Sequence, residues 1–305
     1  MNKSFYGQYI VVIDAGGTKT VGTLVEMQSK KILFQIQTGP GNIVSNNDYA
    51  EQNIEDALIQ CAEQIQIKPL RAIIGIAGFN TYKHRWHTPL HWYNYINENI
   101  AVTSDIELGY RAEFPKGEGM LVISGTGAII CLEHQNKLKT LGGWGHLLGD
   151  EESAYGIGKK AIQQVLESME YCYRSILKDQ WIKDDYPASS NKLKEWFYCQ
   201  DKEAIAQLSL WVESTAKNGN SEAQSIISDA SRKMAGSVYK AITSLGLSSS
   251  IPLIVKGGMF ENNDRYFSEF QKHISNFQLT NTVSKSNKNI FVEAACFNYY
   301  KGVRK

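Results

Sequence analysis

Apolar residues in this chain gather into short continuous runs, and most of these runs end in glycine or a small polar residue. Runs of about four to eight apolar residues between turn residues are typical of strands buried inside a sheet. The strands expected on this basis are Tyr9–Asp14, Val21–Met27, Lys31–Gln37, Ala72–Ala77, Ile100–Thr103, Met120–Ser124, Ala128–Glu133, Lys137–Leu141, Ile251–Lys256 and Phe277–Leu279.

Between these runs, apolar residues recur three and four positions apart, which is the spacing of one helix face. A long helix is expected from about Ser221 to Leu245, where Gly246 ends it. One further expected helix carries Ile54, Leu58 and Ile65, and another covers Tyr82–Tyr95, losing regularity at Pro89. The remaining expected helices cover Ile106–Ala112, residues 154–169, Leu193–Phe197, Ile205–Val212, Phe267–Ile274 and Glu293–Lys301. Strands that alternate with helices predict an α/β fold.

One order of elements occurs twice, once from Tyr9 and once from Met120. Each time a strand leads through a Gly/Thr turn into two further strands, which indicates an internal duplication of topology. A Pro-Lys-Gly-Glu-Gly link at 115–119 separates the copies. With 305 residues the chain also exceeds what one core usually holds. We expect an N-terminal domain at 1–116 and a C-terminal domain at 117–305, whose last helix can pack back on the first domain.

The amino-acid composition excludes several classes of protein. The net charge is +1, from 32 basic and 31 acidic residues spread along the chain, which excludes a nucleic-acid or membrane-surface footprint. Five cysteines stand far apart without a CxxC pair, so they are expected to be free thiols in a reducing compartment. We see no signal peptide and no apolar run of membrane-spanning length, and therefore expect a cytoplasmic protein.

The first expected strand ends in Asp14-Ala15-Gly16-Gly17-Thr18-Lys19. Backbone N–H groups of such a turn can bind a phosphate, with Thr18 adding a hydroxyl and Asp14 holding a hydrated magnesium ion. The alternative is a hairpin turn in which Asp14 forms an Asx-turn. The short motif alone favours neither.

Ser124-Gly125-Thr126-Gly127 opens the second half as Gly16–Lys19 opens the first. Two such turns at matching places favour a phosphate clamp over two coincident hairpins. Gly257 and Gly258 follow a third buried strand and can form a backbone wall for a nucleotide. Taken alone, that pair is better explained as a strand-to-helix turn.

Gly143-Trp144-Gly145-His146, followed by Asp150 and Glu151, is the most specific stretch. Carboxylates can accept hydrogen bonds from ligand hydroxyls, and an indole can pack on the apolar face of a sugar. The alternative has Asp150 or Ser153 capping the next helix and Trp144 in the core. That alternative leaves the glycines around Trp144 unexplained.

Asp105 stands between an expected strand and an expected helix. As a general base it would take a proton from an acceptor hydroxyl during phosphoryl transfer. As an N-cap it would need no further function, and the residues alone favour the cap.

These motifs together resemble the N-acetylglucosamine kinase branch of the sugar kinases, which includes the BadF/BadG/BcrA/BcrD-type ATPases. The resemblance covers most of the chain and implies the actin-like ATPase (ribonuclease H-like) fold, with duplicated mixed sheets, flanking helices and a central cleft. The segments that carry it are DAGGTKT at 14–20, GPGN at 39–42, GIAG at 75–78, TSD at 103–105, VISGTG at 122–127, GGWGHLLGDEESAY at 142–155 and VKGG at 255–258.

The resemblance implies an enzyme that transfers the γ-phosphoryl group of ATP, with Mg²⁺, to the 6-hydroxyl of an amino sugar. N-acetylglucosamine is favoured over glucosamine and N-acetylmuramic acid. An ATPase that activates or senses for a protein partner is the alternative from another class. The family also implies a homodimer.

The resemblance also assigns roles by matching position. Asp105 becomes the catalytic base, which replaces the cap favoured above, and Asp14 orients the metal through water. The implied sugar contacts are Asn42, Gly78, Gly143, Trp144, Gly145 and Asp150. The implied nucleotide contacts are Gly16, Gly17, Thr18, Lys19, Gly125, Thr126, Gly127, Gly257 and Gly258.

Two positions depart from the family pattern. Ala128 stands where relatives commonly carry Ser after SGTG, so one hydroxyl contact is lost. The segment Val292–Cys296 lacks the glycine that the family usually has beside the nucleotide. Both departures concern the nucleotide side of the expected site, not the sugar side.

Overall fold

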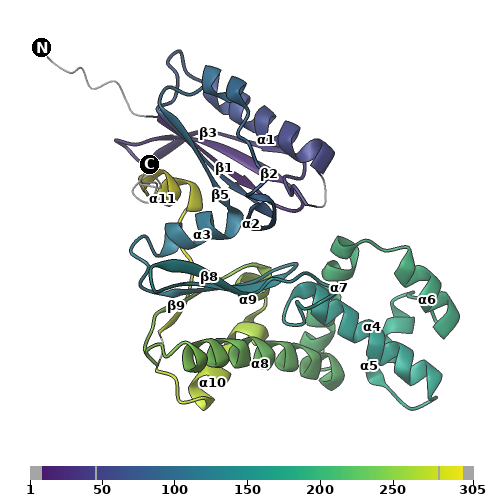
Figure 1. The fold of residues 1–305 in the computed structure, drawn as a ribbon. Coiled ribbons are helices and arrows are strands. Elements are labelled where there is room, and N and C mark those ends of the chain that lie inside the picture. Colours follow the sequence, from purple (N-terminus) through teal and green to yellow (C-terminus); the bar gives the residue numbers. More distant parts are fainter. Residues whose placement is uncertain (1–8, 45–46, 281, 298–305) are drawn as a thin grey trace, which may run out of the picture. The chain divides into compact units, whose positions relative to one another are not determined.

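The first of two five-stranded sheets is built from the N-terminal part of the chain (Figure 1). The computed structural model describes residues 9–44, 47–280 and 282–297. Strand β1 pairs antiparallel with β2 on one side and parallel with β4 on the other. The sheet order is β3-β2-β1-β4-β5, with bounds Tyr9–Ala15 (β1), Thr20–Glu26 (β2), Lys31–Thr38 (β3), Arg71–Ile76 (β4) and Asn99–Ser104 (β5).

The second sheet repeats this order as β8-β7-β6-β9-β10, with the same directions: β6 is antiparallel to β7 and parallel to β9. Its strands are Met120–Ser124 (β6), Ala128–His134 (β7), Lys137–Gly142 (β8), Leu253–Lys256 (β9) and Val283–Lys285 (β10). The duplicated mixed sheets predicted from the sequence are therefore confirmed.

The prediction of a strand at Phe277–Leu279 is wrong. Phe277 caps α10 (Asp264–Asn276), its N–H donating to the carbonyl of His273, and Gln278 has a left-handed φ of 58°. A chain that closes a helix in this way cannot also be extended, so the last strand of the sheet forms later, as β10.

Helices cover both faces of the first sheet. Alternate side chains of β1 point to opposite faces, which is why its run is apolar throughout. Val11 and Ile13 pack with α1 (Asn47–Ala62) on one face, and Ile10 and Val12 pack with Leu108 on the other. That second face is covered by α3 (Asp105–Glu113) and α11 (Ile290–Cys296), seen below the sheet in Figure 1.

The C-terminal helix belongs to the first sheet and not to the second. The described residues divide into two compact units, one formed by those up to Gly117 together with residues 287–297, the other by those between Glu118 and Ser286. The position of α11 agrees with the expectation that the last helix can pack back on the first domain, and the second unit ends at Ser286. The physical reason is that Ala294 and Ala295 of α11 are buried against Ile10 and Val12. Residues 298–301 of the expected terminal helix lie outside the described residues.

The second unit carries five helices between β8 and β9, and they share one apolar core with its sheet. One of them, α5, was not expected; its central Trp181 is fully buried against Trp196, Tyr186 and Trp211. The helices of this unit are Ala154–Glu170 (α4), Ile176–Lys183 (α5), Ser190–Tyr198 (α6), Lys202–Lys217 (α7), Ser221–Ser244 (α8), Gly258–Asn262 (α9) and α10.

The helix predicted at Tyr82–Tyr95 does not form. The segment holds only the end of α2 (Phe79–Tyr82) and a short 3-10 helix at Leu90–Asn94. Pro89 immediately precedes the 3-10 helix, and proline lacks the N–H that the middle of a helix requires. The helical spacing of aromatic residues here reflects burial of Trp92 against Trp86 in the core under α1.

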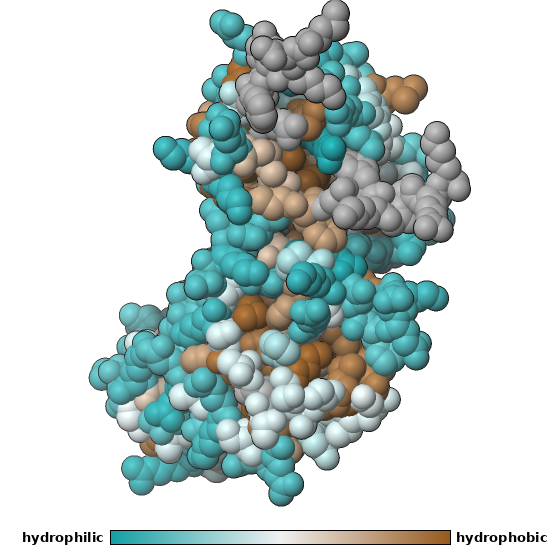
Figure 2. Space-filling view, turned by 90° about the vertical axis from the view of Figure 1, so that its left-hand side faces the viewer, coloured by the Kyte–Doolittle hydropathy of each residue, from teal (hydrophilic) through white to brown (hydrophobic). Residues whose placement is uncertain are grey.

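The face of the molecule seen in Figure 2 carries both hydrophilic and hydrophobic residues. The face in Figure 2 is covered largely by hydrophilic residues, with hydrophobic ones showing between them. Within the described ranges, no helix combines the length and the apolar character needed to cross a membrane.

Candidate active site

The polar and glycine residues singled out from the sequence in the first unit lie at one edge of its sheet. Asp14 stands near the end of β1, Gly78 follows the end of β4, and Asp105 follows the end of β5. These three strands are parallel neighbours, so their carboxyl ends meet at the same edge. In open α/β sheets that edge is where ligands bind.

The turn after β1 is tight, and its tip is open to solvent. The Gly16 N–H donates to the Lys19 carbonyl at 2.9 Å, while Gly17, Thr18 and Lys19 are exposed. A Cβ added at Gly17 would meet nothing within 4 Å, and its φ lies outside the left-handed region. The fold therefore does not require glycine at 17, whereas close approach of a ligand to the backbone would.

Asn42 and Gly78 are brought together although they are far apart in sequence. The Asn42 Oδ1 accepts a hydrogen bond from the Val44 N–H at 2.8 Å. A Cβ at Gly78, whose φ is +81°, would lie 3.0 Å from that same oxygen. The preceding loop is tied to the first turn, because the Gly41 N–H donates to the Gly16 carbonyl at 2.9 Å. Both implied sugar-binding residues of this unit thus adjoin the turn at Gly16–Lys19.

Asp105 is not the cap of its helix. Ser104 is the N-cap of α3, and its hydroxyl accepts from the Glu107 N–H. Asp105 is the first helical residue, half-buried, with Oδ1 accepting from the Ile106 N–H at 2.9 Å. Burial raises the pKa of its carboxyl to about 6, and the negative charge of Asp14 adds to the rise. The cap interpretation is therefore wrong.

The carboxylates of Asp14 and Asp105 lie close enough for the charge of one to raise the pKa of the other. Two nearby carboxylates suit a divalent cation, which would offset their repulsion. Among the described residues no group of three or more His, Cys, Asp or Glu side chains could hold a metal by itself.

The turn after β6 is fixed by the segment that follows the second glycine loop. The Gly125 N–H donates to the Gly127 carbonyl, and the Gly125 carbonyl accepts from the Ala154 N–H at 2.8 Å. The Ser124 hydroxyl donates to the Glu152 carbonyl at 2.9 Å. The turn therefore sits directly against the N-terminus of α4, a position that favours an anion.

Asp150 supports this second turn. It is 7% exposed, has a left-handed φ of 61°, and its Oδ1 accepts from the Ala128 N–H at 3.3 Å. A Cβ at Gly127 would lie 2.9 Å from its other oxygen, so any larger residue there would displace the carboxylate. The cap of α4 is Ser153, whose hydroxyl accepts from the Gly156 N–H. Of the two caps considered from the sequence, Ser153 is confirmed and Asp150 is not.

Trp144 is 73% exposed, so the interpretation of this side chain as core is wrong. Gly143 and Gly145 flank it with φ of +70° and +84°. A Cβ at Gly143 would lie 2.5 Å from Ile129 Cδ1, so this glycine is required where the loop crosses β7. The loop thus presents a large indole to solvent, as a ligand-binding loop would.

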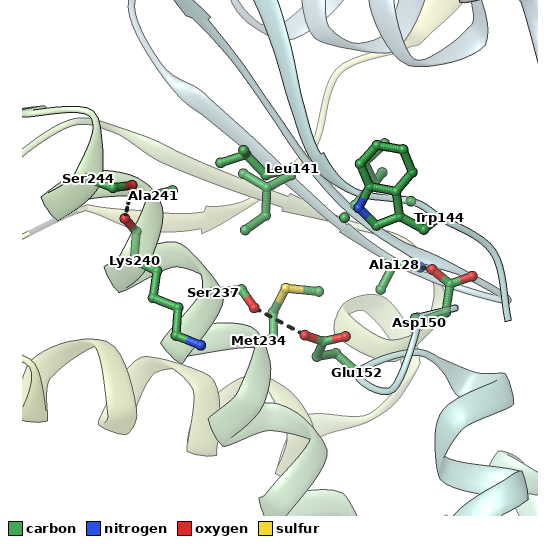
Figure 3. Close-up of a pocket in the computed structure, with 15 residues that line it drawn as sticks. Ala128, Leu141, Trp144, Asp150, Glu152, Met234, Ser237, Lys240, Ala241 and Ser244 are labelled. Atoms are coloured by element: carbon green, nitrogen blue, oxygen red, sulfur yellow. Dashed lines mark hydrogen bonds between the residues drawn. The ribbon is translucent and has the colours of Figure 1, made fainter. Parts of the chain in front are cut away.

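A pocket of about 300 Å³ opens beside this loop, between β7, β8 and α8 (Figure 3). We call it the Trp144 pocket. Trp144 and Asp150 line one end, and the Glu152 carboxylate, which accepts from the Ser237 hydroxyl at 3.1 Å, lies beside Met234. Its volume suits a small ligand.

A second pocket, of about 360 Å³, adjoins the second turn. We call it the α7 pocket. Gly125, Thr126 and Gly258 line it, as do residues that the sequence did not point to, from α7 and from the end of α9. Gly257 is required here, because a Cβ on it would lie 2.5 Å from the Ser124 carbonyl oxygen. The pair Gly257-Gly258 therefore packs on the second turn, and the adjoining helices complete a pocket beside it.

Comparisons with known proteins agree on a family. The model of the BadF/BadG/BcrA/BcrD ATPase family matches residues 11–293. The N-acetylmuramic acid/N-acetylglucosamine kinase of Clostridium acetobutylicum is 28% identical over 300 residues, which cover 93% of this chain and 96% of that protein.

Solved structures agree on the fold. One is a Chromobacterium violaceum protein described as an N-acetylglucosamine kinase. It superposes on this chain with a TM-score of 0.74 at 17% identity, and the match covers 95% of this chain and 98% of that one. A ROK family glucokinase of Streptomyces griseus, in complex with glucose and AMPPNP, gives 0.58 at 14% identity, covering 94% and 98%. At these identities the likeness shows the actin-like sugar kinase fold alone.

Proposed function

Because the chain belongs to the BadF/BadG/BcrA/BcrD ATPase family, we propose that it is an ATP-dependent amino-sugar kinase that phosphorylates the 6-hydroxyl of N-acetylglucosamine. Support for a sugar acceptor comes from its resemblance to a kinase of N-acetylmuramic acid and N-acetylglucosamine over nearly the whole length of both chains. Support for ATP comes from the family and from the AMPPNP-bound structure of the same fold.

The observation that carries the proposal is the raised pKa of the Asp105 carboxyl. A general base works best when its pKa lies near the working pH. The carboxyl of Asp105 meets this condition, since burial and Asp14 raise its pKa to about 6. At pH 7 to 8 it is mostly ionised and can accept the proton of a sugar hydroxyl as the phosphorus–oxygen bond forms. It shares its edge of the sheet with the turn at Gly16–Lys19.

The proposal also assigns residues to the phosphates, the metal ion and the sugar. Gly16, Gly17, Thr18 and Lys19 would bind phosphate oxygens from one turn, and Gly125, Thr126 and Gly127 from the other. Asp14 would hold the magnesium ion through water, and the bound ion would neutralise charge on the phosphates. Asn42, Gly78, Trp144 and Asp150 would contact the sugar.

Three further features complete the proposal. Mg²⁺ is the expected metal, and a homodimer is the expected assembly, which sedimentation would measure. A cytoplasmic location is in keeping with five cysteines that are all free thiols, of which Cys61 and Cys131 are buried.

The test is ADP release measured with N-acetylglucosamine, glucosamine, N-acetylmuramic acid and no sugar. We expect release to depend on N-acetylglucosamine. Faster turnover on glucosamine or N-acetylmuramic acid would change the proposed substrate, but the protein would still be an amino-sugar kinase. Equal release with and without every sugar would remove the kinase proposal and favour an ATPase that acts on a protein partner.

The 6-deoxy analogue of N-acetylglucosamine serves as the matched control for the reacting atom. It should bind and compete with N-acetylglucosamine but yield no phosphorylated product. A phosphorylated 6-deoxy sugar would show that another hydroxyl is the acceptor.

A further inference from the structure

A third pocket, of about 440 Å³, is lined by residues that the proposed reaction does not use. The first halves of α4 and α8 form its walls, together with the tip of the second glycine loop. We call it the α4–α8 pocket. It shares only Gly149 with the Trp144 pocket and no residue with the α7 pocket. It is therefore a separate cavity within the second unit.

Positive charge exceeds negative charge in the α4–α8 pocket. Its charged side chains are Lys159, Lys160, Arg232, Lys233, Glu151 and Asp229, which leaves a formal surplus of two positive charges. Both acids are already held by bases of α8. The Lys233 ammonium donates to the Glu151 carboxylate. The Arg232 guanidinium donates to the Asp229 carboxylate at 2.9 Å. The surplus therefore belongs to α4.

The two lysines of α4 have no ion pair among the described residues. Lys159 is half-buried and Lys160 is exposed. Both ammonium groups lie near the Glu151 carboxyl, because their charges add to the effect of Lys233 in lowering its pKa. One carboxylate thus faces three ammonium groups and accepts from only one of them. An anion with several oxygens could accept from the other two.

Apolar surface lies beside these charges. Ile157 and Ile226 are almost fully buried where they line the pocket. Leu147 and Leu148, at the tip of the loop, are each 82% exposed. Covering two adjacent leucines removes apolar surface from water, which favours a ligand with an organic part over a bare inorganic anion.

The tip of the loop is a tight turn between two residues of the proposed sugar site. The Gly149 N–H donates to the Gly145 carbonyl at 2.9 Å, and Trp144 and Asp150 stand immediately outside this bond. His146 in the tip packs edge-on against a ring of the first turn of α4, with centroids 4.8 Å apart. A ligand that contacts the tip therefore acts on the segment that holds Trp144.

We propose that the α4–α8 pocket binds a phosphate monoester of a small organic molecule and that its occupancy changes the setting of Trp144. A phosphate monoester carries about −1.5 to −2 charges at pH 7, which matches the surplus on the pocket. Lys159 and Lys160 bind the phosphate, and Leu147 and Leu148 cover the organic part. This site goes beyond the proposed reaction, in which the pocket takes no part.

The probe is N-acetylglucosamine 6-phosphate, titrated calorimetrically without ATP and with saturating N-acetylglucosamine, which occupies the proposed sugar site. The wild type should bind one equivalent. The double variant Lys159→Gln/Lys160→Gln should bind at least about tenfold more weakly, and its affinity should depend less on salt. The matched control is Lys192→Gln/Lys194→Gln, which removes two exposed lysines of α6 and should bind as the wild type does.

Two further measurements test the organic part and the effect on the loop. Inorganic phosphate should bind the wild type more weakly than the ester. The fluorescence of Trp144, taken as the difference between the wild type and Trp144→Phe, should change when the ester saturates the pocket. The same concentration of ester should leave it unchanged in Lys159→Gln/Lys160→Gln.

Equal affinity of the ester for the wild type and for Lys159→Gln/Lys160→Gln would overturn the site, as would a wild type that does not bind the ester. Equal affinity for inorganic phosphate would overturn the organic class of ligand. Unchanged Trp144 fluorescence would overturn the effect on the loop. None of these measurements needs turnover, so their outcome is distinct from that of the kinase assay.

Discussion

The two sheets share one strand order, yet the residues at their strand ends differ in kind. At the end of β1 stands Asp14, and at the matching end of β6 stands Ser124. After β5 comes Asp105, whereas β10 is followed by Ser286. Glycines follow both β4 and β9. The duplicated framework thus keeps two backbone turns, but at these strand ends acidic side chains stand in the first half only.

The halves also differ in what lies between their strands. One helix, α1, connects β3 to β4, whereas five helices connect β8 to β9. Those added helices supply the walls of both the Trp144 pocket and the α7 pocket. Under the proposed function, the first half supplies the chemistry and the second supplies ligand-binding surface. The predictions below separate these two contributions.

The largest effect is expected from Asp105→Asn, because the first half then loses its base. Turnover should fall by about 10²- to 10⁴-fold, while sugar binding is kept. The fold should tolerate the change, because the Asn oxygen can still accept from the Ile106 N–H. Steady-state kinetics and calorimetric titration with sugar check both parts. Glu107→Gln, on the same helix, is the control that should retain most turnover.

The raised pKa of Asp105 predicts opposite trends for activity and stability. Turnover should fall as pH drops below about 6, because the base becomes protonated. A carboxyl whose pKa rises on folding stabilises the protein most when protonated, and this contribution is lost as pH rises from about 4 to about 6. The loss amounts to at most about 3 kcal/mol.

The matching measurement is the melting temperature of the wild type and of Asp105→Asn across this pH range. Relative to the wild type, the variant should gain stability from pH 4 to 6 and keep a constant advantage above that. A difference that does not depend on pH would show that the carboxyl titrates normally in the folded protein.

Much of the fold could be predicted from the sequence, because the features that define it depend on residues close together in the chain. Buried strands, glycine turns and the repeated order of elements each depend on neighbouring residues. Even so, local spacing misled at Tyr82–Tyr95, where Pro89 and packing of Trp92 override helical periodicity. The choice of Ser104 over Asp105 as the cap also needed the structure, since both residue types cap helices equally well.

What the sequence could not predict depends on distant segments meeting. The α7 pocket draws its walls from residues near 125, 203–213 and 258–263. No periodicity relates these three stretches to one another. Likewise, α11 lies on the first sheet because of a fit between two alanines and β1, which a pattern of apolar positions does not specify.

A smaller effect is expected from Gly17→Ala, which tests whether the first turn binds phosphate through its backbone. The added methyl meets no protein atom, so stability should change by less than about 0.5 kcal/mol. Catalytic efficiency with ATP should fall by about tenfold, the equivalent of one lost backbone contact.

Gly41→Ala is the structural counterpart of Gly17→Ala. Its Cβ would lie 2.5 Å from both Ala15 Cβ and Thr20 Oγ1, so about 1–3 kcal/mol of stability should be lost. Denaturant titration of both variants distinguishes the two glycines. A stable Gly17→Ala enzyme with normal ATP kinetics would show the first turn to be only a hairpin.

The smallest effect is expected from Trp144→Ala, on the ligand-binding side of the comparison. An indole that is 73% exposed contributes little to the core, so the free energy of unfolding should change by less than about 0.5 kcal/mol. Loss of ring packing on a sugar is worth about 0.5–1.5 kcal/mol, so the sugar KM should rise roughly threefold to tenfold. Trp181→Ala is the matched control, because that fully buried ring should cost about 3–5 kcal/mol of stability. If Trp144→Ala left the sugar KM unchanged, the exposed loop would have to serve something other than the acceptor, and the contribution of the second half would reduce to the nucleotide.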